Sequence, residues 1–489
     1  MSKKKDNTEA KKDILLYDDH KLVTRRDFLS SGMISMSTFA LAPTLLSLLK
    51  SNSAYALECN TAQATIGKTP VIIFDLSGGA NLVGSNVMVG GPGGQMDFLA
   101  TYETLGLPMD MHPSKANQLS SELGLAFHGD SAILRGIVSE TSGNVRPKVD
   151  GAVFCTSSGD DTANNPHNPI YWLNKAGAMG GLTQLAGTSN SISGGKSIVP
   201  DASIDPTVKP VVLNRPQDAL GLVNIGKLGE LFTPQKAQRI LKAIERMSEQ
   251  KIMSYGQKSL PDQIKDLVKC GYIGSQDLIG KYTADALDAS KDPMVTQVFD
   301  NLNNGDQRKV ATMMKLLMDG HLGVATIEKG GYDYHNNTRA TGETRDFEAG
   351  ALIGRCIELA SLKGKDLVVY VITDGGVAAR EGIDNSVGGR GKLSWTGDSG
   401  QRSSTFMLVY RNLGRATLRN GNRQIGSFKD TGAVENAATP SSNSVVNLAK
   451  LITANYLALH GEENKLAAIV GDNPFGANLD KYLVFNKIT

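Results

Sequence analysis

The feature that most constrains the fold is a set of short apolar runs, each of which carries an ionisable residue to a glycine-containing turn. Such runs are typical of strands that are buried on both faces of a sheet. A helix-length segment without proline, residues 343–362, separates the second run from the third. The runs span residues 69–76, 322–327 and 367–373, and the ionisable residues at or just beyond their ends are Asp75, Asp333, His335 and Asp374.

Strands that alternate with helices predict an α/β fold with a mostly parallel central sheet, right-handed crossovers and helices on both faces. Residues 131–138 and 404–410 are two further candidate strands, and residues 444–460 are a candidate helix. In such sheets, ligands bind outside the carboxyl ends of the strands. We therefore expect the four ionisable residues of the three runs to lie together at one edge of the sheet.

Three segments interrupt the alternating pattern. Residues 185–210 are rich in Gly, Ser and Pro and are expected to form an exposed excursion. Residues 212–320 place apolar residues at helical spacing and are expected to form a mainly helical insertion or cap within one α/β domain, residues 57–489. Residues 380–401 are expected to form a long polar loop that contains Trp395 and Asp398.

The N-terminal residues contain the three parts of an export signal. Residues 24–30, Thr-Arg-Arg-Asp-Phe-Leu-Ser, form a twin-arginine motif, an apolar run follows at residues 32–49, and residues 54–56, Ala-Tyr-Ala, form a small-residue cleavage site. The apolar run contains Pro43 and several hydroxyl residues, which disfavours a permanent membrane span. The sequence thus predicts a signal peptide over residues 1–56, passage through the twin-arginine translocase, and a periplasmic or extracellular mature protein.

The charge balance gives no electrostatic basis for a nucleic-acid partner. Of the 51 Lys and Arg and the 49 Asp and Glu residues, nine and six lie in residues 1–56. The rest of the chain therefore carries 42 basic and 43 acidic side chains. Nucleic-acid-binding domains are distinctly basic, so this class of function is not expected.

The cysteines are scattered and form no CxxC pair, so neither a zinc cage nor a redox motif is expected. Four cysteines in an exported protein permit two disulfides in any of three pairings. The alternative is that the thiols remain free and buried, which we expect for the cysteine inside the candidate helix 343–362. The four residues are Cys59, Cys155, Cys270 and Cys356.

Two hydroxyl residues are candidate nucleophiles. Ser77 follows the first apolar run and opens a Ser-Gly-Gly-Ala turn, whose small residues let a ligand approach the backbone. Thr156 begins a Thr-Ser-Ser segment, a composition that is also common in ordinary turns. Spacing fixes no base for either residue. No GxGxxG fingerprint follows a strand, so nucleotide-dependent redox chemistry is not expected.

The order of these motifs resembles that of a widespread exported family of unknown function that is related to alkaline phosphatases and sulfatases. The resemblance rests on the twin-arginine leader, on Ser-Gly-Gly-Ala at residues 77–80, and on Gly-Tyr-Asp-Tyr-His at residues 331–335, which is similar to the Gly-Trp-Asp-Thr-His motif of that family. It covers most of residues 68–460 in order. It implies an alkaline phosphatase-like fold in which Asp and His residues hold one or two divalent metals that serve a Ser or Thr nucleophile in phosphoryl or sulfuryl transfer.

The chain departs from the family pattern at three places. Asn81 stands where the family has Asp, residues 374–376 (Asp-Gly-Gly) replace an acidic-aromatic-glycine pattern, and residues 398–400 (Asp-Ser-Gly) stand where the family has Asp-His-Gly. Only seven histidines occur, one of them in the leader, which is few for a site with two zinc ions. An oxygen-rich site better suits calcium or magnesium. The candidate metal ligands are Asp75, Asp333, His335, Asp374 and Asp398.

Two functions are compatible with these patterns. The first is an exported, metal-dependent hydrolase of small phosphate or sulfate esters, with Ser77 or Thr156 as the nucleophile. The second is a catalytically degenerate member that keeps the fold and acts as a binding or structural component of the cell envelope. The retained acidic and imidazole residues favour the first function, and the missing Asp-His pair favours the second.

Overall fold

The computed structural model describes residues 68–159, 166–188, 210–220, 284–335 and 338–488, together with residues 239, 243 and 246. The predicted signal peptide, most of the segments 185–210 and 212–320, Cys59 and Cys270 lie outside the described residues. The described parts of the predicted insertion include the helices α4 (Pro216–Leu220), α8 (Ala284–Leu287), α9 (Pro293–Val298) and α10 (Gly305–Met318).

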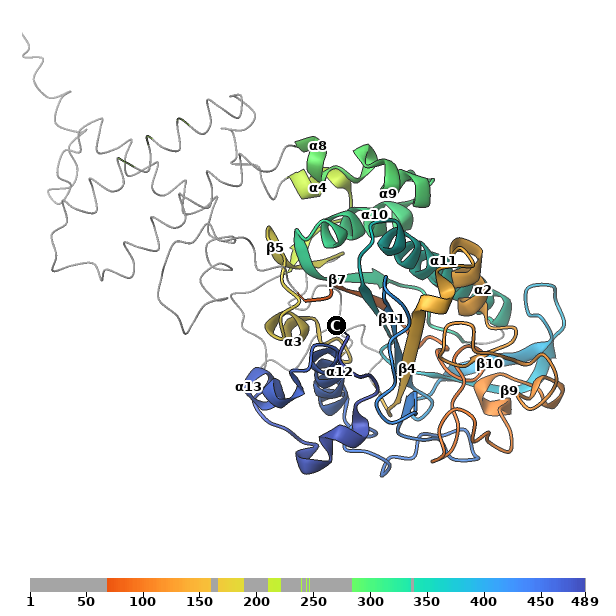
Figure 1. Cartoon of the computed structure of the whole chain (residues 1–489). Coiled ribbons are helices and arrows are strands. Elements are labelled where there is room, and N and C mark those ends of the chain that lie inside the picture. Colours follow the sequence, from red (N-terminus) through yellow and green to blue (C-terminus); the bar gives the residue numbers. More distant parts are fainter. Residues whose placement is uncertain are drawn as a thin grey trace, which may run out of the picture.

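An eight-stranded sheet has the strand order β12-β4-β11-β8-β1-β7-β5-β6. It lies at the centre of the described chain (Figure 1). Neighbouring strands are parallel except on the two sides of β11, which is antiparallel to both β4 and β8. The expected α/β fold with a mostly parallel sheet is therefore confirmed. The strands are β1 (Val71–Leu76), β4 (Val149–Cys155), β5 (Thr183–Gly187), β6 (Val211–Val212), β7 (Leu322–Lys329), β8 (Leu367–Ile372), β11 (Ser404–Tyr410) and β12 (Gln424–Ile425).

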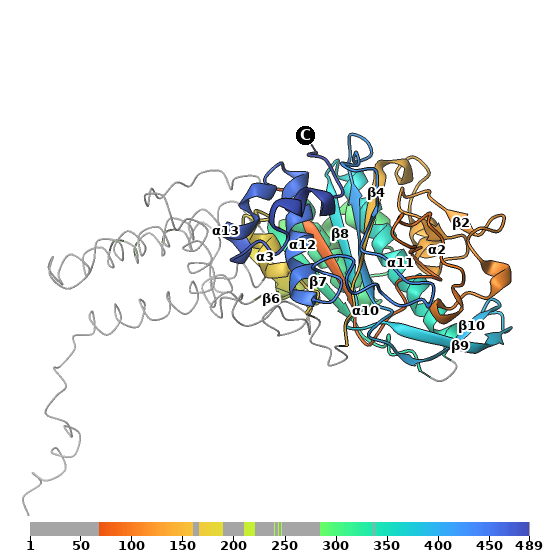
Figure 2. The ribbon, with the colours of Figure 1, turned by 90° about the horizontal axis from the view of Figure 1, so that it is seen from below.

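The two faces of the sheet pack into two separate hydrophobic cores. In β1, Ile72 and Phe74 enter one core, whereas Val71 and Ile73 enter the other, because successive side chains of a strand point to opposite faces. Helices cover both faces, and Figure 2 shows the sheet between the two groups. The first core is closed by α2 (Ala132–Glu140), α10 and α11 (Arg339–Leu362), and the second by α3 (Ile170–Lys175), α12 (Val445–Leu459) and α13 (Leu466–Val470).

Glycines allow α2 and α11 to cross at very short range. A methyl group on Gly350 of α11 would lie 2.1 Å from the Ile133 carbonyl oxygen, and one on Gly136 of α2 would lie 2.2 Å from the Phe347 carbonyl oxygen. Any larger side chain at these positions would push the two backbones apart. The crossing fixes α11, whose N-terminal half lies beneath the loop that follows β7.

Most of the predicted core elements are confirmed, but two predictions are wrong. Residues 131–138 belong to α2 and not to a strand, because Ser131 caps a helix by accepting a hydrogen bond from the backbone N–H of Leu134. Residues 380–401 are not a long loop. They contain most of the antiparallel hairpin of β9 (Val377–Asp384) and β10 (Lys392–Asp398), which is anchored by the buried Trp395.

Smaller features complete the described chain. The predicted excursion begins later than residue 185, because residues 185–187 are buried in β5. Cys155 and Cys356 are free and buried, as expected for Cys356. Among the described residues, no helix has the length and apolar character needed to cross a bilayer. The remaining elements are β2 (Leu119–Ser120), β3 (Phe127–His128), η2 (Glu103–Leu105), η3 (Met109–Met111), η4 (Arg146–Lys148), η6 (Ala289–Lys291), η7 (Glu463–Lys465) and η8 (Gly476–Tyr482).

Candidate metal centre

The loop that follows β7 separates its residues into a buried pair and an accessible pair. Tyr332 and Tyr334 are fully buried, whereas Asp333 and His335 between and after them reach solvent. The Tyr332 hydroxyl donates to the carbonyl oxygen of Arg345 at 2.8 Å, so the loop is tied to α11. The alternation of buried and accessible residues places the Asp333 and His335 side chains on the same outer side of the loop.

The β9–β10 hairpin is held against this loop by aromatic and ionic contacts. The rings of Tyr334 and Trp395 stack with their centroids 6.2 Å apart, and the Arg339 guanidinium lies 4.3 Å from the Trp395 ring. Buried Lys392, at the start of β10, donates to the Glu343 carboxylate of α11 at 2.9 Å. These contacts fix the course of β10, which ends at Asp398 beside the loop.

Asp333, His335 and Asp398 bring their ligand atoms together. The candidate ligand atoms lie within 4.8 Å of one another. The His335 Nε2 atom contacts Asp333 Oδ1 and lies 3.6 Å from Asp398 Oδ2. The three side chains are 58%, 41% and 35% exposed in chain order. One imidazole nitrogen and two carboxylate oxygens suit a borderline or hard divalent cation, and their exposure leaves room for water or a substrate oxygen.

Asp374 has a different role, because its carboxylate is bound by the backbone. Its Oδ1 atom accepts hydrogen bonds from the N–H groups of Gly78 at 2.6 Å and Gly79 at 3.0 Å. Both glycines have positive φ, 121° and 94°. Asp374 therefore holds the turn after β1 in a conformation that favours glycine.

This glycine turn packs against the segments that carry Asp333 and Asp398. A methyl group on Gly78 would be 2.6 Å from the Asp333 backbone nitrogen, and one on Gly79 would be 3.1 Å from Asp398 Oδ1. A methyl group on Gly397 would likewise be 3.1 Å from His335 Nδ1. Three glycines thus allow three chain segments, those after β1, after β7 and at the end of β10, to meet closely at the carboxyl edge of the sheet.

The other predicted site residues are not members of this group of three. Asp75 is fully buried within β1, in register with Glu328 of β7. Thr156 is also fully buried, and its hydroxyl donates to the Ser441 carbonyl oxygen at 2.8 Å. Ser77 is 6% exposed and donates to the carboxylate of Glu328. The group that could hold a metal contains three of the five predicted ligands.

Two residues at the site were missed in the sequence. Glu328 is the hydrogen-bond partner of Ser77 and directly follows the predicted strand 322–327. Asp346, on α11, accepts hydrogen bonds from the Tyr334 hydroxyl and from the Asn86 side chain, both at 2.8 Å. For Asp346, the alternation Tyr-Asp-Tyr-His was the available signal, because it predicts that the two tyrosines are buried and that their hydroxyl groups need hydrogen-bond partners in the core.

Burial sets the protonation of Asp346. The pKa of the Asp346 carboxyl group is raised to about 7. The larger cause is desolvation, and the second is the negative charge of the neighbouring Glu343. The hydrogen bonds from Tyr334 and Asn86 and the charge of Arg339 act in the opposite direction. A carboxyl group that titrates near neutrality thus lies directly behind the loop that carries Asp333 and His335.

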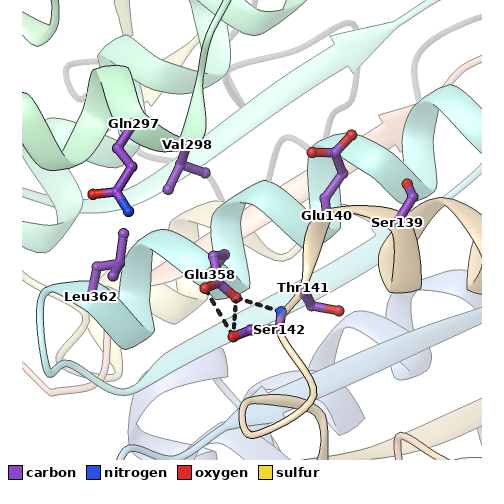
Figure 3. A pocket seen from close by; sticks show the side chains of 8 residues that line it. All are labelled: Ser139, Glu140, Thr141, Ser142, Gln297, Val298, Glu358 and Leu362. Atoms are coloured by element: carbon purple, nitrogen blue, oxygen red, sulfur yellow. Dashed lines mark hydrogen bonds between the residues drawn. The ribbon is translucent and has the colours of Figure 1, made fainter.

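A hollow of about 360 Å³ lies away from this site, between α2, α9 and the C-terminal end of α11 (Figure 3). Because α11 returns from the end of β7 to the start of β8, its C-terminal end lies near the opposite edge of the sheet. The Glu358 carboxylate in the hollow accepts hydrogen bonds from the backbone N–H and the hydroxyl of Ser142. The hollow contains none of the candidate metal ligands.

Comparison with known proteins adds no assignment. Profiles of known protein families give no match to the chain, and a search of curated proteins finds no relative with significant similarity.

Proposed function

We propose that this protein binds a divalent cation through Asp333, His335 and Asp398 and hydrolyses small phosphate or sulfate esters. The observation that carries the proposal is the convergence of these three side chains, with ligand atoms within 4.8 Å of one another, at the carboxyl edge of a mostly parallel sheet. Ligands of α/β proteins bind at this edge.

Three further features support the proposal. The sequence motifs resemble those of the exported family related to alkaline phosphatases and sulfatases, and we propose membership of that group. Asp398 stands at the motif that departs from the family, yet its Oδ2 atom lies 3.6 Å from His335 Nε2, so the altered motif still brings a carboxylate to the imidazole. The twin-arginine motif supports export, which would place the activity in the periplasm or outside the cell.

The residues of the site would have two different roles, metal binding and support of the glycine turn. Asp333, His335 and Asp398 would hold the cation, and Asp374 keeps the neighbouring glycine turn in place. A bound divalent cation supplies Lewis-acid stabilisation of negative charge on the transferred group. The donor set of two carboxylates and one imidazole is suited to magnesium, manganese or zinc, whereas calcium requires more oxygen ligands.

Metal analysis and turnover assays on the same preparation test the proposal. The protein is purified after export, its metal content is measured by elemental analysis, and the hydrolysis of an aryl phosphate and an aryl sulfate is followed with added magnesium, manganese or zinc. We expect about one bound divalent ion per chain and turnover of one ester class. Asp333→Ala should lose both the ion and the turnover.

A matched carboxylate serves as the control. Asp384 lies on the same hairpin as Asp398, at the opposite end of β9 from the site, so Asp384→Ala should keep the metal and the turnover. Absence of a bound ion in the wild-type protein, together with no turnover of either ester, would refute the proposal.

One observation favours a second function, a binding or structural component of the cell envelope. Thr156 is fully buried, and the Asp374 carboxylate is engaged by two backbone N–H groups, so two residues that could serve catalysis instead support the fold. Metal binding without turnover of any ester would favour this function over hydrolysis.

A further inference from the structure

Ser77 and Glu328 form a hydroxyl–carboxylate pair where β1 and β7 end. The Ser77 hydroxyl donates a hydrogen bond of 3.0 Å to Glu328 Oε1. The Ser77 backbone is held on both sides, because its N–H donates to the Lys329 carbonyl oxygen and its carbonyl oxygen accepts from the Tyr332 N–H, both at 3.2 Å. The position of the hydroxyl is therefore set by the sheet and by the loop that carries the candidate metal ligands.

A glycine lies against the solvent side of this pair. A methyl group on Gly330 would lie 3.3 Å from Glu328 Oε1 and 3.8 Å from Ser77 Oγ. Gly330 itself is exposed, and Glu328 is half-buried. A larger residue would cover the hydroxyl and the carboxylate, whereas glycine leaves an approach from solvent to a side chain that is otherwise 6% exposed.

A guanidinium group lies at the same turn. A methyl group on Gly331 would be 2.9 Å from the Arg345 guanidinium carbon, so the group packs against the bare glycine. In the described part of the chain, no carboxylate forms an ion pair with Arg345. A half-buried arginine that pairs with no carboxylate of the described residues, packed on the glycine next to Gly330, favours a substrate with a negative charge.

We propose that Ser77 is a nucleophile toward phosphoryl groups and that Glu328 accepts its proton, an inference that rests on the ester-hydrolase function proposed above. The Ser77 Oγ atom attacks phosphorus, an Oγ–P bond forms and the bond from phosphorus to the leaving oxygen breaks. The hydroxyl proton passes to Glu328, and the leaving oxygen, on the opposite side of phosphorus, takes a proton from water. A second water then attacks the phosphoserine, the Oγ–P bond breaks as Glu328 returns its proton to Oγ, and phosphate is released.

A fluorophosphonate probe tests this inference directly, because it forms a stable bond to an activated serine without turnover. The full chain is incubated with the probe, digested, and the peptide that contains Ser77 is examined by mass spectrometry. We expect one adduct, on Ser77. Glu328→Gln should lower the rate of adduct formation by about 100-fold or more, because general-base catalysis contributes factors of this size.

Two matched variants control the experiment. Ser403→Ala removes a buried hydroxyl at the same edge of the sheet that donates to a carbonyl oxygen, at 3.2 Å from Gly375, and should not change the labelling. Glu348→Gln removes an exposed carboxylate of the ion pair with Lys329 and should also leave it unchanged. Circular dichroism checks that each variant is folded. A folded wild-type protein without a Ser77 adduct, or equal labelling rates for wild type and Glu328→Gln, would overturn the inference.

The proposed metal site and the proposed nucleophile can be tested independently of each other. Labelling of Ser77 in His335→Ala protein, or in the presence of a chelator, would support the inference even if the metal site were wrong. Conversely, a Ser77→Ala protein that binds the metal and turns over esters at the wild-type rate would overturn the inference while the proposed hydrolase function stands.

Discussion

The His335 Nε2 atom lies 3.6 Å from Asp398 Oδ2, although α11, β8 and β9 lie between the two residues along the chain. Two features allow the two side chains to come this close. Tyr334 stacks on Trp395, which aligns β10 with the loop after β7. Gly397 lacks the side chain that would press on the imidazole ring. The site therefore depends on the docking of the hairpin as much as on the ligands themselves.

Removal of Asp398, the proposed ligand on the hairpin, should weaken metal binding. Asp398→Ala leaves one carboxylate and one imidazole, and we expect the dissociation constant for the divalent cation to rise about 100-fold, because loss of a supporting group alone costs 10- to 100-fold. Isothermal titration calorimetry with the metal-free protein measures the change. Asp384→Ala on the same hairpin should bind as the wild type does. Equal affinity of Asp398→Ala and wild type would exclude Asp398 as a ligand.

Loss of the Asp374 carboxylate should destabilise the fold. Asp374→Ala leaves the N–H groups of Gly78 and Gly79 without their acceptor, and buried unsatisfied groups cost about 1–3 kcal/mol each. We expect the free energy of unfolding to fall by about 2–6 kcal/mol in urea titrations. Asp374→Asn keeps a carbonyl acceptor, so its free energy of unfolding should fall less than that of Asp374→Ala. A loss below about 1 kcal/mol in Asp374→Ala would show that water replaces the carboxylate.

Local pattern was sufficient for the centre of the sheet. The apolar runs at residues 69–76, 322–327, 367–373 and 404–410 are strands because they combine β-branched residues with turn residues at their ends. Residues 131–138 show where this signal fails. A short apolar run fits a buried strand or a buried helix, and the cap at Ser131 together with close packing on α11 decides for the helix.

The site was predicted in part. The rule that strand ends share one edge placed Asp333 and His335 correctly beside the turn after β1. Asp398 was a candidate only through the resemblance, and its position beside His335 could not be derived, because it depends on a hairpin that the polar sequence of residues 380–401 did not indicate. The hydrogen bonds of Asp374 could not be predicted either. A carboxylate at a strand end has the same sequence pattern whether it binds a cation or two backbone N–H groups.

The glycine crossing between α2 and α11 should tolerate no added methyl group. In Gly350→Ala, the new carbon would lie 2.1 Å from the Ile133 carbonyl oxygen, a backbone atom that cannot rotate away. Overpacking of this kind costs about 1–3 kcal/mol and occasionally more, and we expect at least the upper value. Chemical denaturation measures the loss. Gly305→Ala, which meets only the end of the Arg308 side chain at 4.0 Å, is the matched control and should be nearly neutral.

The buried Asp346 should make stability depend on pH. Its pKa rises from 3.8 in the unfolded chain to about 7 in the folded protein, chiefly because of desolvation. Between these values the folded state holds more protons than the unfolded state, so this group's contribution to stability is complete below pH 4 and is lost as the pH rises to 7. Three pKa units correspond to about 4 kcal/mol.

Urea unfolding of wild type and Asp346→Asn between pH 4 and pH 8 measures this contribution. The asparagine cannot ionise, so the stability of wild type relative to the variant should fall as the pH rises and become constant above pH 7. His128, whose pKa is lowered to about 4 by burial, acts in the opposite direction but equally in both proteins. Tyr334→Phe removes a donor that favours the charged carboxylate and should extend the fall to higher pH. A stability difference that does not change with pH would show that Asp346 remains charged beneath the site.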